Sequence, residues 1–226
     1  MRAAIYFTPP ADAPLTKAAA DWLGWDAFSA SPTRKAHPAI DAIVHDPARY
    51  GFHATLRAPF RLADGRDLSA LDEALAAFAK ARRGFVIPQL ALSRLGDFFA
   101  LVPRFASDEI RQLEGAVVRA FEPFRAPLTE AEIARRMPDR LTERQRRYID
   151  EWGYPYVLDE FRFHMTLTSR IPARESADVM GQLSERFGEF AEAPLRIDGL
   201  ALFVEPAPGE PFRVHSRHPF QTNSQR

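Results

Sequence analysis

Two short segments of the chain repeat the same pattern of side chains that can do acid–base chemistry. Residues 50–56 read YGFHATL and residues 161–167 read FRFHMTL, and their histidines lie 111 residues apart. Imidazole can give or take a proton near neutral pH, and a threonine two positions later on a strand points the same way as the histidine. We therefore predict one site that uses both segments, with four catalytic residues: His53, Thr55, His164 and Thr166.

Two imidazoles and two hydroxyls that converge on a cleft suit the cleavage of a phosphate diester. One histidine would deprotonate the attacking water, and the other would protonate the leaving oxygen on the far side of phosphorus. The threonine hydroxyls would hold the non-bridging oxygens, where negative charge builds up. Arg57 and Arg162 are predicted to share the strand faces of the histidines and to add charge-assisted hydrogen bonds to the substrate. The pattern does not tell which histidine is the base.

Two tyrosines come shortly before the second motif. Tyr154 and Tyr156 are predicted to reach the mouth of the cleft, where they would bind substrate by stacking on a base or a sugar. A packed turn around Pro155 is the alternative use of this aromatic cluster.

Other chemistries fit the two motifs less well. Two histidines give a zinc ion only two ligands, and neither a cysteine nor a repeated acidic residue accompanies them. A threonine nucleophile would need its own activating base. A structural role is common for a single histidine on a strand, but two in matching contexts disfavour it. We therefore expect no metal ion and no other cofactor.

The elements that carry the motifs also repeat. Each motif alternates apolar and polar residues, which is typical of a half-buried strand. The first is followed by a predicted helix over 67–82 and the second by a predicted helix over 174–190. A predicted β-hairpin follows each helix, and Leu-Ala-Leu occurs in both hairpins, at 90–92 and 200–202. The same order at the same offset indicates an internal duplication.

This order predicts an α+β fold with two lobes around a central cleft, each an antiparallel sheet with helices on one side. We expect one domain over residues 1–226, with repeats at 50–105 and 161–215 and an insertion at 126–160. Helix-start signatures in the insertion are Thr129-x-x-Glu132 and Thr142-x-x-Gln145. An opening strand over 2–8 and a helix over 15–25 come first, then a proline-punctuated stretch over 31–50 without an assigned element. The tail after Phe220 is predicted to be disordered.

Composition limits the classes of function. The chain has 30 basic and 30 acidic residues and a formal net charge of zero, which favours neither nucleic acid nor membrane surface as a partner. Three of the basic residues are lysines and the rest are arginines, which suit bidentate binding of phosphate. The chain has no cysteine, and its first residues turn polar too soon for a signal peptide. We expect a cytoplasmic protein whose oligomeric state the sequence does not reveal.

The tetrapeptides HATL at 53–56 and HMTL at 164–167 resemble the twin H-x-[ST]-hydrophobic signature of the 2H phosphoesterase superfamily. That superfamily includes proteins similar to the 2′,5′ RNA ligase, cyclic nucleotide phosphodiesterases and RNA 3′-end phosphodiesterases. The wider wording, YGFHATLRAPF and WGYPYVLDEFRFHMTL, is similar to a branch of phosphonate metabolism proteins. The resemblance implies a bilobed fold and metal-independent chemistry on cyclic phosphoesters, with His53, Thr55, His164 and Thr166 as the motif residues.

The sequence therefore favours a cyclic phosphodiesterase that hydrolyses a small nucleotide or sugar phosphate. Its expected partner is this small phosphorylated substrate, with RNA less favoured because the net charge is zero. Two alternatives stay open, namely a non-catalytic phosphoester-binding or regulatory protein and an RNA end-processing phosphodiesterase or ligase. A binder would not need a pair of titratable groups, which favours catalysis.

Overall fold

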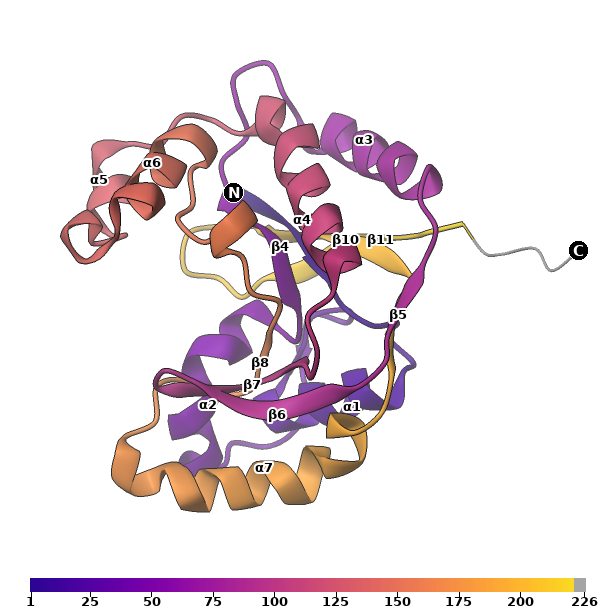
Figure 1. Ribbon diagram of the computed structural model, residues 1–226, viewed down its shortest axis with the longest axis vertical. Coiled ribbons are helices and arrows are strands. Elements are labelled where there is room, and N and C mark those ends of the chain that lie inside the picture. The colour runs from indigo at the N-terminus through magenta and orange to yellow at the C-terminus, as the bar shows by residue number, and fades with distance from the viewer. Residues whose placement is uncertain (222–226) are drawn as a thin grey trace, which may run out of the picture.

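The computed structural model describes residues 1–221 and shows a mixed α+β fold (Figure 1). Residues 222–226, most of the tail predicted to be disordered, lie outside the described residues. The strands are β1 (Arg2–Phe7), β2 (Trp25–Asp26), β3 (Ser31–Pro32), β4 (Ala54–Phe60), β5 (Phe85–Ile87), β6 (Leu90–Leu95), β7 (Phe98–Pro103), β8 (Met165–Thr166), β9 (Leu195–Ile197), β10 (Gly199–Glu205) and β11 (Arg213–Pro219). The α-helices are α1 (Pro14–Leu23), α2 (Pro38–Tyr50), α3 (Leu68–Lys80), α4 (Asp108–Ala120), α5 (Glu130–Ala134), α6 (Glu143–Trp152) and α7 (Ser176–Ala191).

A seven-stranded antiparallel sheet runs through the molecule in the order β11-β10-β1-β4-β8-β7-β6. The two motif strands, β4 and β8, are direct neighbours at its centre and pair at Ala54 and Met165. Because each motif histidine stands immediately before its strand, this pairing brings the two motifs together. The α+β class and the antiparallel pairing predicted from the sequence are confirmed.

The order of strand, helix and three further strands occurs twice, as β4-α3-β5-β6-β7 and β8-α7-β9-β10-β11. The hairpins are exchanged between the two halves of the sheet. Hairpin β6–β7 pairs with β8, whereas hairpin β10–β11 lies beyond β1 on the side of β4. Likewise α3 packs on β10 and β11, and α7 packs on β6 (Figure 1). Each half of the fold thus combines parts of both sequence segments, and a duplication as their origin stays a prediction.

The helices form two groups around the sheet. Helices α3 and α4 lie beside β10, β11 and β4, while α1, α2 and α7 lie at the opposite end near β6 (Figure 1). Helix α5, helix α6 and the segment up to residue 160 form the insertion, which projects to one side (Figure 1). Both capping boxes predicted there are present, at Thr129 with Glu132 and at Thr142 with Gln145. Among residues 1–221, none of the helices combines the length and apolar character needed to cross a membrane.

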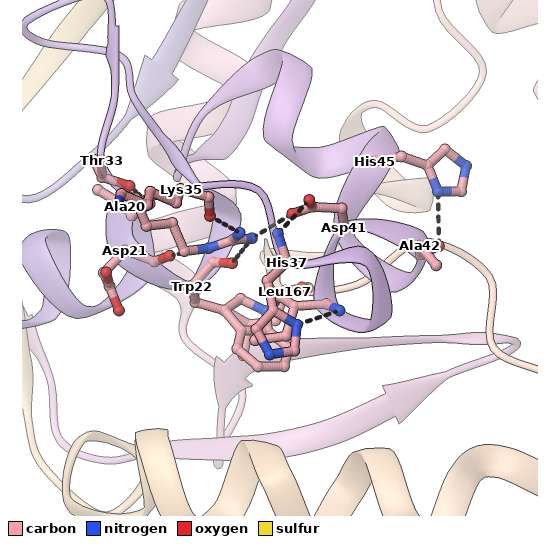
Figure 2. Close-up of polar contacts among 12 residues, drawn as sticks. Ala20, Asp21, Trp22, Thr33, Lys35, His37, Asp41, Ala42, His45 and Leu167 are labelled. Atoms are coloured by element: carbon pink, nitrogen blue, oxygen red, sulfur yellow. Dashed lines mark hydrogen bonds and ion pairs between the residues drawn. The ribbon is translucent and has the colours of Figure 1, made fainter.

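Helices α1 and α2 hold the second motif in place. The indole Nε1 of Trp22 in α1 donates a hydrogen bond of 2.7 Å to the carbonyl of Leu167, the last residue of that motif (Figure 2). The Arg34 guanidinium joins the two helices, because it donates to the carbonyls of Asp21 and Trp22 and pairs with Asp41 of α2 at 2.7 Å. The motif strand is thereby fixed from its carboxyl end.

The first motif does not keep the regular alternation expected from its sequence. Tyr6 of β1 pairs with Thr55, but the preceding residue of β1, Ile5, pairs with Arg57, because the register shifts between them. Such a β-bulge moves the following side chains to the other face of the sheet. Arg57 therefore lies on the face of Ile5, beneath α4, and the expectation that it shares the face of His53 is wrong.

The second motif forms less strand than its alternation suggests. Only Met165 and Thr166 make up β8, and the three residues before His164 have no strand assignment. Phe163, Met165 and Leu167 are nevertheless buried in the core, as expected for the apolar face. The alternation therefore predicts which side chains are inside, although the ladder of backbone hydrogen bonds is short.

Candidate active site

The two motif histidines are held by the same backbone contact. His53 Nδ1 lies 2.9 Å from the carbonyl oxygen of Gly51, and His164 Nδ1 lies 2.7 Å from the carbonyl oxygen of Arg162. A carbonyl oxygen only accepts, so Nδ1 of each ring is the protonated donor. A neutral ring then carries its lone pair on Nε2, which is the nitrogen left to act on a ligand.

The rings are also fixed by aromatic neighbours. His53 stacks on Tyr6, with ring centroids 3.8 Å apart and an interplanar angle of 18°. His164 lies against Phe98 at 5.7 Å. These contacts and the carbonyl bonds together fix the direction in which each Nε2 points.

Both histidines favour the neutral form in the unliganded protein. Desolvation lowers the pKa of His53 from 6.5 to about 4; the hydrogen bond to Gly51 opposes this shift, and the nearby His164 adds to it. Desolvation also lowers the pKa of His164, again opposed by its backbone hydrogen bond. Two titratable groups perturbed in this way and close to each other mark a candidate functional site.

Two adjoining cavities open at the histidines. The first, which we call the His164-side cavity, has a volume of about 610 Å³ and these polar lining residues: Thr55, Arg94, Gln145, Glu160, Arg162 and His164. The second, the His53-side cavity, measures about 280 Å³ and is lined among others by Tyr6, Asp46, Tyr50, His53 and Thr166. Thr55 and Tyr154 line both cavities, so the two meet at these side chains. Their combined size suits a small molecule.

The predicted catalytic residues lie together at this junction. The Thr55 hydroxyl lies 3.2 Å from His53 Nε2 and donates to it when Nδ1 holds the ring proton. Thr166, on the neighbouring strand, lines the His53-side cavity with His53. Two hydroxyls and two imidazoles thus border two cavities that meet at Thr55 and Tyr154, and their catalytic role stays a prediction.

The predicted tyrosines line the cavities as well. Tyr154 borders both, and desolvation raises its pKa to about 12, so the phenol keeps its proton. Tyr156 borders the His164-side cavity, is 47% exposed, and meets Tyr154 edge-on at 5.6 Å. Both tyrosines therefore line a cavity, and a packed turn does not account for them alone.

A buried carboxyl group anchors the segment that carries these tyrosines. Glu114 of α4 accepts hydrogen bonds from the backbone N–H of Leu158 at 3.1 and 3.3 Å. Leu158 has a φ of 53°, a left-handed conformation that costs energy for a leucine and needs such a fixed environment. Burial raises the pKa of Glu114 to about 7. The segment that carries Tyr154 and Tyr156 is therefore bound to α4, which itself packs on β4.

The two predicted arginines have different positions. Arg162 is exposed and lines the His164-side cavity. Arg57 is 3% exposed, donates to the carbonyl of Val118 at 2.8 Å and pairs with Glu122, so its guanidinium holds α4 on the sheet. Arg57 borders neither cavity. The prediction that it contacts the substrate is therefore wrong, because the β-bulge turns its side chain to the other face of the sheet.

Several cavity residues have no signal in either motif. Phe98 and Arg94 come from the β6–β7 hairpin, and Gln145 comes from α6. Tyr6, a further cavity residue outside the motifs, lies on the strand predicted over 2–8. The others are brought in by long-range packing.

Gly51 should tolerate no side chain, because its backbone has φ 71° and ψ 176° and a Cβ there would lie 2.6 Å from the Cβ of Ala27. We expect Gly51→Ala to lower the free energy of unfolding by about 1–3 kcal/mol from backbone strain, and by more because of the clash. It should also displace the carbonyl that orients His53. Gly65→Ala is the matched control, since Gly65 also has a positive φ of 74° but meets nothing within 4 Å. Denaturant unfolding of both variants checks this, and equal losses would contradict the role of the clash.

Within residues 1–221, no group of three or more His, Asp or Glu side chains is arranged to hold a metal ion. The two cavities are lined by imidazole, hydroxyl, phenol and guanidinium groups and by the carboxylates of Asp46 and Glu160.

Comparison with known proteins places the chain in a family. The family model described as "Protein of unknown function (DUF1045)" matches residues 55–213. The chain belongs to this family. The matched region begins at Thr55, two residues after His53, and includes the whole second motif.

Two curated relatives of this DUF1045 chain are named "Ribose 1,5-bisphosphate phosphokinase PhnN". The one from Janthinobacterium sp. (strain Marseille) is 39% identical over 236 residues, covering 100% of this chain and 52% of the relative. The one from Laribacter hongkongensis (strain HLHK9) is 36% identical over 218 residues, covering 95% of this chain and 50% of the relative. The chain thus spans about half the length of the curated relatives it matches.

Solved structures with a similar arrangement cover almost the whole chain at low sequence identity. "Crystal structure of phosphoesterase" has 13% identity and a TM-score of 0.43, with 98% of both chains covered. TT0787 of Thermus thermophilus has 15% identity and a TM-score of 0.45, with 97% of this chain and 98% of that chain covered. E. coli LigT complexed with ATP has 14% identity and a TM-score of 0.41, with 98% of both chains covered.

Proposed function

We propose that this chain is a metal-independent phosphoesterase of the 2H type that hydrolyses a cyclic phosphodiester of a small sugar phosphate or nucleotide. The observation that carries the proposal is the shared geometry of His53 and His164. Each ring donates from Nδ1 to a backbone carbonyl two residues earlier and keeps Nε2 for a ligand, beside cavities that meet at Thr55. A base and an acid on two sides of one phosphorus atom are what in-line hydrolysis needs.

His53 is the better candidate for the base in hydrolysis. Its pKa is lowered to about 4, so the ring is neutral over the physiological range and can accept a proton from water. His164 also has a lowered pKa, and a bound phosphodiester anion would raise it again by favouring the imidazolium. Water then adds to phosphorus, one ester P–O bond breaks, and the departing oxygen takes the proton of His164. The products balance, because the diester and water give a phosphomonoester and a free hydroxyl.

The named relatives favour a ribose phosphate over a free nucleotide as the substrate. Those relatives are named for a kinase that acts on ribose 1,5-bisphosphate. This chain has no GxxxxGK[ST] motif of the P-loop type, so we assign it no kinase step. Hydrolysis of a ribose 1,2-cyclic phosphate that carries a 5-phosphate, with cleavage at the O2–P bond, would yield ribose 1,5-bisphosphate. We propose that the chain supplies this product to such a kinase.

Turnover of cyclic phosphates with EDTA present tests the proposal. The panel contains nucleoside 2′,3′-cyclic phosphates and ribose cyclic phosphates with and without a 5-phosphate, and phosphorus NMR identifies the product. We expect hydrolysis of at least one ribose cyclic phosphate. Binding across the panel without any turnover would instead favour a phosphoester-binding protein, and strongly salt-dependent binding of RNA would favour RNA end processing.

The pH dependence of kcat/KM should peak on the acid side of neutrality. The base must be unprotonated, so the rate falls below the pKa of His53, about 4. The acid must be protonated, so the rate falls about tenfold per pH unit above the lowered pKa of His164. We therefore expect a maximum between about pH 4 and 6.5 with a 2′,3′-cyclic nucleotide, whose diester does not titrate in this range. A rate that keeps rising above pH 8 and is lost with chelator would indicate a metal-bound hydroxide instead.

A further inference from the structure

The His164-side cavity carries two arginines that no acidic residue neutralises. Among residues 1–221, neither Arg94 nor Arg162 has a carboxylate within ion-pair distance, and the only hydrogen bond from either side chain is a long one, 3.4 Å, from Arg94 to the carbonyl of Ile171. Both side chains are exposed toward the cavity that they line. Two unneutralised guanidinium groups beside one cavity attract an anion.

Arginines elsewhere near the site are used differently. Arg57 and Arg125 both pair with Glu122, and Arg61 pairs with Glu132. These guanidinium groups connect elements of the fold and are saturated by carboxylates. Arg94 and Arg162 differ from these three arginines because they have no carboxylate partner among residues 1–221 and line the His164-side cavity.

The two cavities differ in charge. The His53-side cavity includes Asp46 and no arginine, whereas the His164-side cavity has Arg94 and Arg162 against one carboxylate, Glu160. That carboxylate already accepts a hydrogen bond of 2.9 Å from Gln145 Nε2. With the histidines neutral, the His164-side cavity keeps one net positive charge, and an extended anionic substrate would place its second charged group there.

The arginines stand on separate elements around the reacting histidine. Arg162 lies two residues before His164, and its backbone carbonyl, not its side chain, orients that ring. Arg94 lies near the end of β6, in the hairpin that brings Phe98 against His164. A group bound by both guanidinium groups would thus lie in the His164-side cavity, which His164 also lines.

We propose that Arg94 and Arg162 form a subsite for a second phosphate group, so that the preferred substrate is a cyclic phosphodiester that also carries a phosphomonoester. This inference rests on the proposed function and adds to it the residues that would bind the second phosphate of the substrate. A phosphomonoester carries up to two negative charges and three acceptor oxygens, which matches two forked donors. The aromatic side chains of Phe98, Tyr156 and Phe161 would cover the sugar between the two phosphates.

Two substrates and three variants test the subsite. The substrates are ribose 1,2-cyclic phosphate and the same compound with a 5-phosphate; the variants are Arg94→Gln, Arg162→Gln and the control Arg170→Gln. Arg170 lies near Arg94 but is paired with Asp97 and lines neither cavity. We expect each of the first two variants to lower kcat/KM for the 5-phosphorylated substrate by about ten- to a hundredfold. The unphosphorylated substrate should change less than about threefold, and the control should change neither.

Equal losses on both substrates would overturn the subsite, because the arginines would then act on the reacting phosphate itself. A binding measurement separates this inference from the proposed function. Ribose 5-phosphate, which has no diester, should bind the His53→Ala variant with an affinity about tenfold or more above that for ribose, and Arg94→Gln in the same background should remove this difference. If ribose 5-phosphate shows this preference while the wild-type protein hydrolyses no cyclic phosphate, the phosphate subsite stands and the proposed reaction fails. If ribose 5-phosphate binds no better than ribose, the subsite is wrong.

Discussion

Replacing His53 or His164 with alanine is expected to lower kcat on a verified cyclic phosphate by about two to four orders of magnitude, as the loss of a general acid or base does. His53 lines one of the two adjoining cavities and His164 lines the other, and no other imidazole among residues 1–221 lines either cavity. The two losses should not add up in the double variant, because base and acid act in the same step. Steady-state kinetics of the three variants check this.

The control for this prediction is His215→Ala. His215 is exposed on β11 and borders neither cavity, so its loss should leave kcat unchanged. Thermal unfolding accompanies each assay, because the His53 variant also loses the stacking on Tyr6 and the bond to Gly51. A folded His53 or His164 variant with nearly wild-type kcat would disprove paired acid–base catalysis.

The sequence predicts the insertion caps and the buried apolar side chains of the two motifs well, because those signals are local. Thr129 and Thr142 make their capping boxes with residues three positions later. The twin motifs share one spacing of histidine and threonine, and period two on a strand already places both on one face. Such features depend on neighbours in the sequence, so no knowledge of the fold is needed.

Arg57 shows where this approach fails. Its face is set by the bulge between β4 and β1, and the partner strand is about fifty residues away in the sequence. Nothing in the wording YGFHATLRAPF reveals that the register shifts after Thr55. The sequence does not reveal either whether an arginine forms an ion pair. Arg57 pairs with Glu122, whereas Arg94 has no carboxylate partner among residues 1–221.

Helix α2 was missed because its prolines suggest breaks. Pro38 stands in the first turn, where a missing N–H does no harm. Pro47 lies inside the helix and leaves the carbonyl of Ile43 without its usual partner. Ser169, just after the second motif, supplies the missing donor with a backbone bond of 2.7 Å to that carbonyl. A long-range contact thus repairs a local defect, and it also ties α2 to the strand that carries His164.

Helix α4 has a local start signal in the sequence. Ser107 caps the helix, and Asp108 and Glu109 give its first turn two acidic residues. Such a start is typical of a helix N-terminus. The helix matters to the site because its Glu114 anchors the tyrosine segment and its Val118 carbonyl receives Arg57.

Replacing the motif threonines with valine is the second change with a large expected effect. Thr55→Val and Thr166→Val keep the β-branched shape and remove only the hydroxyl. If these hydroxyls stabilise charge in the transition state, each change should lower kcat more than it raises KM, by about one to three orders of magnitude. Thr55 lines both cavities and donates to His53 Nε2, whereas Thr166 lines only the His53-side cavity. We therefore expect the larger loss for Thr55→Val.

Serine at the same positions separates the hydroxyl from the methyl group. Thr55→Ser and Thr166→Ser keep the donor, so they should recover most of the activity that valine removes. Their kcat and KM, measured with the same cyclic phosphate, provide the comparison. A rise in KM with unchanged kcat would mean that the hydroxyls bind substrate and transition state equally. If serine were as damaging as valine, the methyl groups and the packing between β4 and β8 would matter instead, and the charge-stabilising role of the hydroxyls would be wrong.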